Sequence, residues 1–165
     1  MRRRGLLYFP SCLAVIILTA CTPAPTGVRD TSVPMGATTR FDPLQFEGTW
    51  QIVASFDPVR AGPLTITVAP EVVGVSVASN SVPEIVGFYD LGSPGVLIPR
   101  TPGAETLVVM WVDEEFQTAA LGTPSGSFGA VLNRSTKIAP DKGVAVREIF
   151  EFYGWDVSRL KRTYK

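Results

Sequence analysis

Few side chains in this sequence could carry out catalysis or bind a metal. The chain has 165 residues, with no His and two Cys, which excludes Ser-His-Asp triads, His general bases and His-ligated zinc sites. The acidic run Asp113-Glu114-Glu115 would need further oxygen ligands to bind a hard cation, and no calcium-loop spacing surrounds it. We therefore predict no catalytic residue, no metal site and no cofactor. The acidic run is expected to be a solvated hairpin tip.

Cys21 follows a segment with the features of a secretory signal. Three Arg residues at positions 2–4 precede an apolar run over residues 6–18, which is too short to span a bilayer comfortably. Residues 18–21, Leu-Thr-Ala-Cys, resemble the lipobox of bacterial lipoproteins, in which the Cys is acylated, for example with palmitate, and becomes the mature N-terminus. The resemblance implies a signal peptide over residues 1–20 and a lipid anchor at Cys21. An ordinary signal peptide followed by an incidental Cys is the alternative.

Cleavage before Cys21 would change the charge and the cysteine inventory. Removing three Arg from 15 Lys+Arg leaves 12 against 15 Asp+Glu, so the mature 145 residues carry a formal charge of −3. No disulfide is expected, because Cys12 leaves with the signal and Cys21 carries lipid. The chain has no basic cluster, which excludes a nucleic-acid partner. Thr22 stands where an Asp would resemble an inner-membrane retention signal, so we expect the outer membrane, facing the periplasm.

Composition divides the rest of the chain into a tether and one domain. Residues 21–40 are rich in Pro, Thr and Gly without an apolar period, which indicates a lipid-anchored flexible tether. The alternative is that part of it lies against the domain, which spans residues 41–165. The C-terminal cations Arg159, Lys161, Arg162 and Lys165 are expected to form a solvated terminus, with contact to anionic lipid as the other possibility.

The domain is predicted to be all-β, with one helix after the strands. Gly and Pro interrupt the chain between residues 50 and 133 too often for long helices, and Val, Ile, Thr and Phe fill the intervals. We predict eight strands, over residues 49–57, 64–69, 72–78, 85–90, 95–99, 105–112, 115–122 and 127–134. The window 104–121 lacks Gly and Pro and could also be helical, but its β-branched run ends in a charged corner, which favours a hairpin.

An amphipathic helix follows the last strand. Val146, Ile149, Phe150 and Tyr153 recur at i, i+3, i+4 and i+7. Asp141 is the predicted N-cap, and Gly154 stands where a left-handed residue would end the helix, with Trp155 placed to touch Phe150. An antiparallel meander of eight strands removes its exposed edges by closing, so we predict an up-and-down barrel with one C-terminal α-helix.

Four segments, in order along the chain, resemble motifs of the lipocalin family, in particular of bacterial lipoprotein lipocalins. They are residues 46–54 (FEGTWQIVA, with Gly-x-Trp at the start of the first strand), 110–119 (MWVDEEFQTA, with an Asp in the corner before an aromatic strand), 131–135 (VLNRS, whose Arg ends the last strand) and 154–160 (GWDVSRL, after the helix). Two features depart from the family pattern. Only 62 positions separate Trp50 from Asp113, so the middle strands must be short, and Phe116 replaces the usual Tyr.

The resemblance implies structural roles for the motif residues. It implies that Gly48, Trp50, Asp113 and Arg134 close one end of the barrel. The planar guanidinium of Arg134 can stack on the indole of Trp50 and donate to nearby carbonyls. The alternative is an unrelated core Trp and a surface Arg. Under either interpretation these residues serve the fold and not a reaction.

Strand alternation predicts which residues face the barrel interior. If Trp50 points inward, regular alternation also turns Ala54 and Phe56 inward. An inward Arg134 likewise brings in Phe128 and Ala130. The strand 105–112 is apolar on both faces, so parity leaves open whether Val109 and Trp111 or their neighbours line the interior. We predict that Ala54, Phe56, Val109, Trp111, Phe128 and Ala130 bind a ligand, with a solid core that has no cavity as the alternative.

The sequence favours binding over catalysis. Our leading hypothesis is a lipid-anchored envelope protein that binds a small hydrophobic or amphipathic ligand for transport or storage; the ligand class, a fatty acid or lysophospholipid, comes from the family resemblance. The alternative is a non-catalytic structural or interaction lipoprotein of the envelope with a filled barrel. An enzyme ranks third, because no group for acid–base or covalent work can be named. The sequence does not identify a protein partner.

Overall fold

Eight antiparallel strands close into a barrel in the computed structural model, which describes residues 27–56, 59–69 and 74–164. Each strand pairs with the next along the chain, and β1 pairs with both β8 and β2, which closes the ring. The all-β, up-and-down, eight-stranded barrel with one C-terminal α-helix is therefore confirmed. The strands are β1 (Gly48–Ser55), β2 (Gly62–Ala69), β3 (Gly74–Ala78), β4 (Gly87–Leu91), β5 (Val96–Pro99), β6 (Leu107–Val112), β7 (Thr118–Gly122) and β8 (Gly129–Asn133).

The helix after the barrel, α2 (Pro140–Phe152), follows the predicted stripe, with Val146 and Phe150 buried against the barrel. Gly154 has a φ of 82°, and the amide of Trp155 donates to the Phe150 carbonyl at 3.0 Å, as predicted for the C-terminal close. The predicted N-cap is wrong. The helix begins one residue before Asp141, because Pro140 suits the first helical position, and Ala139 is the N-cap without a side-chain bond.

Short elements outside the predicted set complete the fold. They are α1 (Pro43–Phe46), capped by the side chain of Asp42, the 3₁₀ turns η2 (Pro83–Ile85) and η3 (Val157–Arg159), and β9 (Lys161–Arg162). The last of these pairs with the stretch of β1 that extends beyond β2. The amide of Thr163 also donates to the Val53 carbonyl at 3.0 Å. The backbone of this segment is therefore paired with β1, whereas the side chains of Lys161 and Arg162 are exposed, as expected for a solvated terminus.

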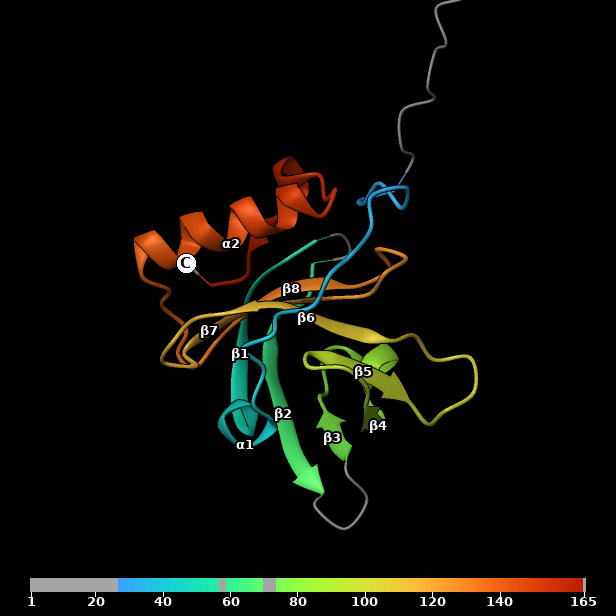
Figure 1. Ribbon diagram of the computed structural model, residues 1–165. Helices are drawn as coiled ribbons and strands as arrows, with labels where there is room; N and C mark the ends of the chain where they lie inside the picture. The colour runs from blue at the N-terminus through green and yellow to red at the C-terminus, as the bar shows by residue number, and fades with distance from the viewer. Residues whose placement is uncertain (1–26, 57–58, 70–73, 165) are drawn as a thin grey trace, which may run out of the picture.

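Two apolar layers result, one inside the barrel and one between its outer wall and α2 (Figure 1). Part of the predicted tether joins the outer layer, as in the second of the two arrangements that the sequence left open. Val28 and Arg29 are buried, and the amide of Asp30 donates to the Gly154 carbonyl at 2.8 Å. Cys21 and the predicted signal peptide lie outside the described residues.

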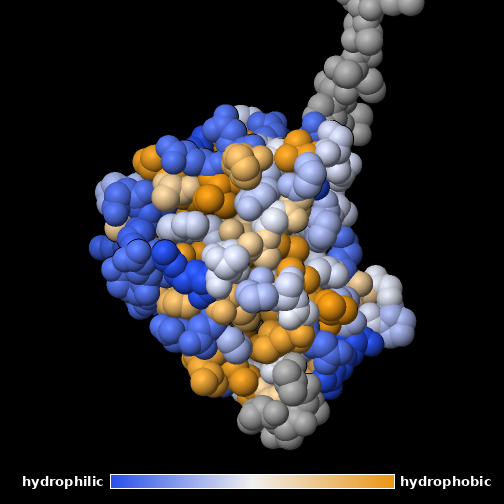
Figure 2. Space-filling model, in the orientation of Figure 1, coloured by the Kyte–Doolittle hydropathy of each residue, from blue (hydrophilic) through white to orange (hydrophobic). Residues whose placement is uncertain are grey.

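The outer wall away from α2 carries scattered apolar side chains. Phe88 on β4 and Ile98 on β5 are exposed, as is Leu44 on α1. Figure 2 shows hydrophobic residues over the barrel and also among the hydrophilic residues of α2, where Val144 and Phe152 are exposed. No helix within the described ranges is long and apolar enough to cross a membrane.

Candidate functional site

The barrel interior is apolar along its whole length. Val109, Phe128 and Ala130, three of the predicted ligand-contacting residues, face inward and are almost fully buried. They pack with side chains from every strand of the ring, including Ile52, Leu64, Ile66, Val75, Val77, Tyr89, Leu97, Leu107, Leu121 and Leu132. The interior thus offers an environment for an apolar molecule, and in this structure protein side chains occupy it.

The other three predicted contacts lie in the outer layer beneath α2. The parity prediction is wrong for Ala54 and Phe56, and Trp111, whose parity the sequence left open, faces outward and is not an interior ligand contact. Phe56 packs its ring against Phe150 and Trp155, with centroids 5.0 and 4.7 Å away.

β-Bulges cause these reversals. The pairing of β1 with β8 shifts register between Ile52 and Ala54, and that of β6 with β7 shifts between Val109 and Trp111. An extra residue in one strand turns the following side chains to the opposite face.

One end of the barrel, here called the floor, is closed by the predicted pair. The guanidinium carbon of Arg134 lies 3.8 Å from the ring centroid of Trp50, which is fully buried. The Arg134 side chain also donates to four backbone carbonyls, those of Gln45 (2.8 Å), Glu47 (2.9 Å), Thr49 (3.2 Å) and Phe116 (3.3 Å). Stacking and directed bonds together fix the guanidinium in one position.

Neighbouring residues at the floor hold the stacked Trp50–Arg134 pair in place. The ring of Phe46 lies 4.7 Å from Trp50, and the Phe46 carbonyl accepts a 2.8 Å bond from the indole N–H. Gly48 has a φ of 106°, and a Cβ there would lie 3.1 Å from Arg134 Nη1. A glycine at this position lets the chain enter β1 next to the guanidinium.

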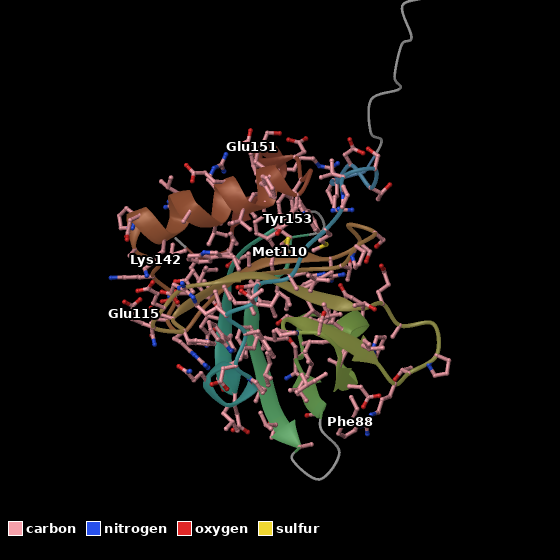
Figure 3. All side chains as sticks on the ribbon, in the orientation of Figure 1. Phe88, Met110, Glu115, Lys142, Glu151 and Tyr153 are labelled. Carbon is pink, nitrogen blue, oxygen red and sulfur yellow. The ribbon has the colours of Figure 1, made fainter. Side chains whose placement is uncertain are left out.

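Asp113 is buried at the floor side, where it holds the β6–β7 corner and the start of α2. Its Oδ1 accepts bonds from the amides of Gln117 (2.7 Å) and Thr118 (2.9 Å), and its Oδ2 lies 2.9 Å from Lys142 Nζ. Burial opposes ionisation of Asp113, but these amides and the ammonium outweigh it and lower the pKa. Lys142 also contacts exposed Glu115 (Figure 3). The solvated hairpin tip is therefore wrong for Asp113, which is buried and accepts two hydrogen bonds from backbone amides, whereas Glu114 and Glu115 are exposed as expected.

The opposite end, here called the mouth, is covered by residues 79–86 between β3 and β4, which we call the lid. Val82 and Ile85 of the lid are buried and belong to the interior cluster. A hollow of about 10 Å³ remains beside Arg60, Glu84 and Phe128, which is about the size that one water needs. The lid therefore plugs the mouth with two apolar side chains.

Few polar contacts hold the lid. Arg60, on the β1–β2 loop, pairs with Glu84 at 3.1 Å, and the two side chains are 34% and 38% exposed. Ser79 Oγ donates to the Pro63 carbonyl at 2.8 Å, and the Tyr89 hydroxyl donates to the Ile85 carbonyl at 2.9 Å. Burial raises the pKa of Tyr89. These bonds link the lid to the rim, and only the one from Tyr89 comes from the interior.

Sequence reasoning missed the lid residues Val82 and Ile85 and the interior Tyr89. The Pro83 that starts η2 was a visible turn signal, but nothing in the apolar pattern distinguishes a loop that folds over the mouth from one that points into solvent. Among the described residues, no group of three or more His, Cys, Asp or Glu side chains is placed to hold a metal ion. The interior is thus built for apolar contact.

Comparison with known proteins supports this architecture. No family model and no curated protein matches the sequence. Among solved structures, the chain is similar to the bovine lipocalin allergen Bos d 2, with a TM-score of 0.57 and 14% identity over 74% of this chain and 94% of the other. It is also similar to the siderocalin Ex-FABP, described as functioning through dual ligand specificities, with a TM-score of 0.53 and 16% identity over 73% and 95% of the two chains.

Proposed function

The chain has a lipocalin-like fold, and from this premise we propose that it binds a small hydrophobic or amphipathic ligand, of the fatty-acid or lysophospholipid class, inside the barrel. The main observation behind this proposal is that the two ends of the barrel differ. The floor is closed by Arg134, which stacks on Trp50 and bonds to several carbonyls, whereas the mouth is closed by a short lid. The ligand enters when the lid moves and takes the place of Val82 and Ile85 in the interior. Transport or storage follows from reversible binding of this kind.

The interior chemistry favours binding over catalysis. The side chains that face inward are apolar apart from a few such as Tyr89, whose hydroxyl is already bonded to the lid. General acid–base work needs a titratable group with access to a reacting atom. Arg134 and Asp113, the charged groups of the floor, are engaged with backbone groups, with Trp50 and with Lys142, and serve the frame of the barrel.

Ligand entry is tested by loosening the lid. In the full-length chain, Glu84→Gln removes the ion pair with Arg60 and is expected to raise the association rate of a fluorescent fatty acid several-fold. Glu114→Gln is the matched control, because it removes a comparable loop ion pair, Arg40–Glu114 at 3.5 Å, at the floor. Absence of saturable binding at micromolar ligand, or equal rates in both variants, would contradict entry through the mouth.

The proposal includes anchoring to the outer membrane through acylated Cys21, with the barrel facing the periplasm. It is supported by the lipobox-like residues 18–21. Metabolic labelling with a palmitate analogue, followed by membrane fractionation, is expected to label the protein and recover it with the outer membrane. Cys21→Ser should abolish the label, whereas Cys12→Ser should retain it. Equal labelling of both variants would contradict acylation at Cys21.

The second candidate function is a structural or interaction lipoprotein whose barrel stays filled. It is favoured by the interior side chains, which occupy the space that a ligand would need, and by exposed Phe88 and Ile98 on adjacent strands. Cross-linking in the envelope distinguishes the two functions. A stable protein partner together with no saturable ligand binding would favour the second candidate.

A further inference from the structure

A groove of about 650 Å³ lies outside the barrel, beneath the first half of α2. Its floor is the outer wall of the barrel, with Val53 and Ala54 of β1 and Val131 of β8. One side is formed by residues 136–147 and the other by the C-terminal segment, with Leu160, Arg162 and Tyr164. In Figure 1 the C-terminal end lies beneath the same part of α2. The volume is in the range of small-molecule sites, about 300–1,000 Å³.

The groove combines an apolar floor with charge of one sign. Lys137, Arg147 and Arg162 line it, and no Asp or Glu is among its lining residues. All three cations are exposed, and no side-chain hydrogen bond or ion pair engages them within the described part of the chain. Lys142 on the same helix differs, because Asp113 and Glu115 hold its ammonium. The groove therefore carries an unbalanced positive charge beside buried apolar surface.

Gly143 keeps the helix side of the groove open. It lies inside α2, where Gly is less favourable than Ala, and a Cβ there would have no atom within 4 Å apart from its chain neighbours and the backbone of its own helix. A larger side chain at this position would therefore extend into the groove without displacing protein atoms. The residue supplies a way to fill the site while leaving the fold intact.

We propose that this groove binds the anion of a long-chain fatty acid, as a second site separate from the barrel interior. The acyl chain lies on Val53, Ala54 and Val131, which are already almost fully buried, so the apolar surface removed from water is mainly that of the acyl chain. The carboxylate lies at the rim among Lys137, Arg147 and Arg162, which donate charge-assisted hydrogen bonds to it. A neutral chain of the same length gains only the first of these contributions, so the site selects an amphipathic anion.

Binding of a fatty acid in this groove is tested on the full-length chain with a fluorescent fatty acid. Gly143→Phe should fill the groove and weaken binding at this site at least tenfold, while Gly143→Ala should retain it. Thermal unfolding of both variants checks that the helix is intact. The combined change of Lys137, Arg147 and Arg162 to Gln should also weaken binding about tenfold. Lys161→Gln is the matched control, because Lys161 neighbours Arg162 and does not line the groove.

A photoreactive fatty acid separates the groove from the interior. Cross-links to residues 136–147 and 160–164 that disappear in Gly143→Phe, persist in Glu84→Gln and weaken when the acid is replaced by the alcohol would support the proposal. Cross-links confined to interior strands, or unchanged affinity in Gly143→Phe, would overturn it. Self-association of the chain through this face, lost in Gly143→Phe without any loss of fatty acid, would also overturn it. Cross-links to interior strands would, by contrast, support ligand binding inside the barrel.

Discussion

The two ends of the barrel are closed by different kinds of contact. At the floor, Trp50 and Arg134 stack at 3.8 Å, and the guanidinium donates to four carbonyls in two separate segments, residues 45–49 and Phe116. At the mouth, Val82 and Ile85 of a loop fill the opening, and the ion pair that ties the loop to the rim is about one-third exposed. The floor couples distant parts of the chain, whereas the lid is a single loop.

This difference assigns separate roles to the two ends. A charged group stacked on an aromatic ring and bonded to several carbonyls cannot leave without exposing all of its partners together, so the floor opens only with global unfolding. A loop with few contacts opens locally at a lower free energy. We therefore expect the floor to stay closed in the folded protein and the lid to open, and each variant below compares the two ends.

The largest expected effect is at the floor. Trp50→Ala should lower the free energy of unfolding by about 3–5 kcal/mol, because it removes a fully buried aromatic side chain and leaves a cavity under Arg134. Ile85→Ala in the lid should cost less, because a loop can relax into the space. Urea denaturation of both variants measures the difference. Equal losses would remove the contrast between the ends.

Arg134→Lys should lower the free energy of unfolding by about 1.5–3 kcal/mol, the range for hydrogen bonds to charged groups. An ammonium cannot reproduce the planar stacking or serve four carbonyls at once. Arg147→Lys, on the exposed face of α2, is the control and should leave the denaturation midpoint unchanged. A small loss in Arg134→Lys would show that charge alone holds the floor.

Sequence reasoning found the floor because its residues carry distinctive chemistry. Trp50, Asp113 and Arg134 are rare types in a recognisable order, and their contacts follow from stacking and hydrogen bonding. The ring of strands followed from turn residues and β-branched runs. The interior was half predicted: Ala130 on β8 and Phe128, two residues before it along the chain, keep regular alternation and face inward as expected.

The bulges and the lid could not be predicted from the same signals. A bulge depends on how two strands pair across the sheet. The apolar pattern of a single strand therefore does not predict that the side chains of Ala54, Phe56 and Trp111 point outward. The lid depends on tertiary contact between Ile85 and the interior. β9 was missed because two exposed cations read as a solvated tail, although the free edge of β1 pairs with them.

Asp113→Asn should lower the free energy of unfolding by about 1.5 kcal/mol at neutral pH, because the amides of Gln117 and Thr118 lose a charged acceptor. Since the folded-state pKa of Asp113 is lowered, the wild-type advantage is complete above the unfolded pKa of about 3.9. It is lost as the pH falls through the folded-state pKa. Denaturation of wild type and Asp113→Asn across acidic pH measures this difference in the free energy of unfolding. A constant difference at every pH would mean that Asp113 does not act through its charge.

The smallest effect on stability, and the sharpest on opening, is expected from Glu84→Gln. A partly exposed ion pair contributes at most about 1 kcal/mol, so the denaturation midpoint should hardly move. The amides of Ile85 and Val86 bond only within the lid, to Val82 and Pro83, so their hydrogen exchange should accelerate several-fold when the tie to Arg60 is lost. The amide of Trp50, at the floor, should exchange at an unchanged rate. Acceleration at Trp50 as well would mean that both ends open in one step, and ligand entry would then require unfolding of the whole barrel.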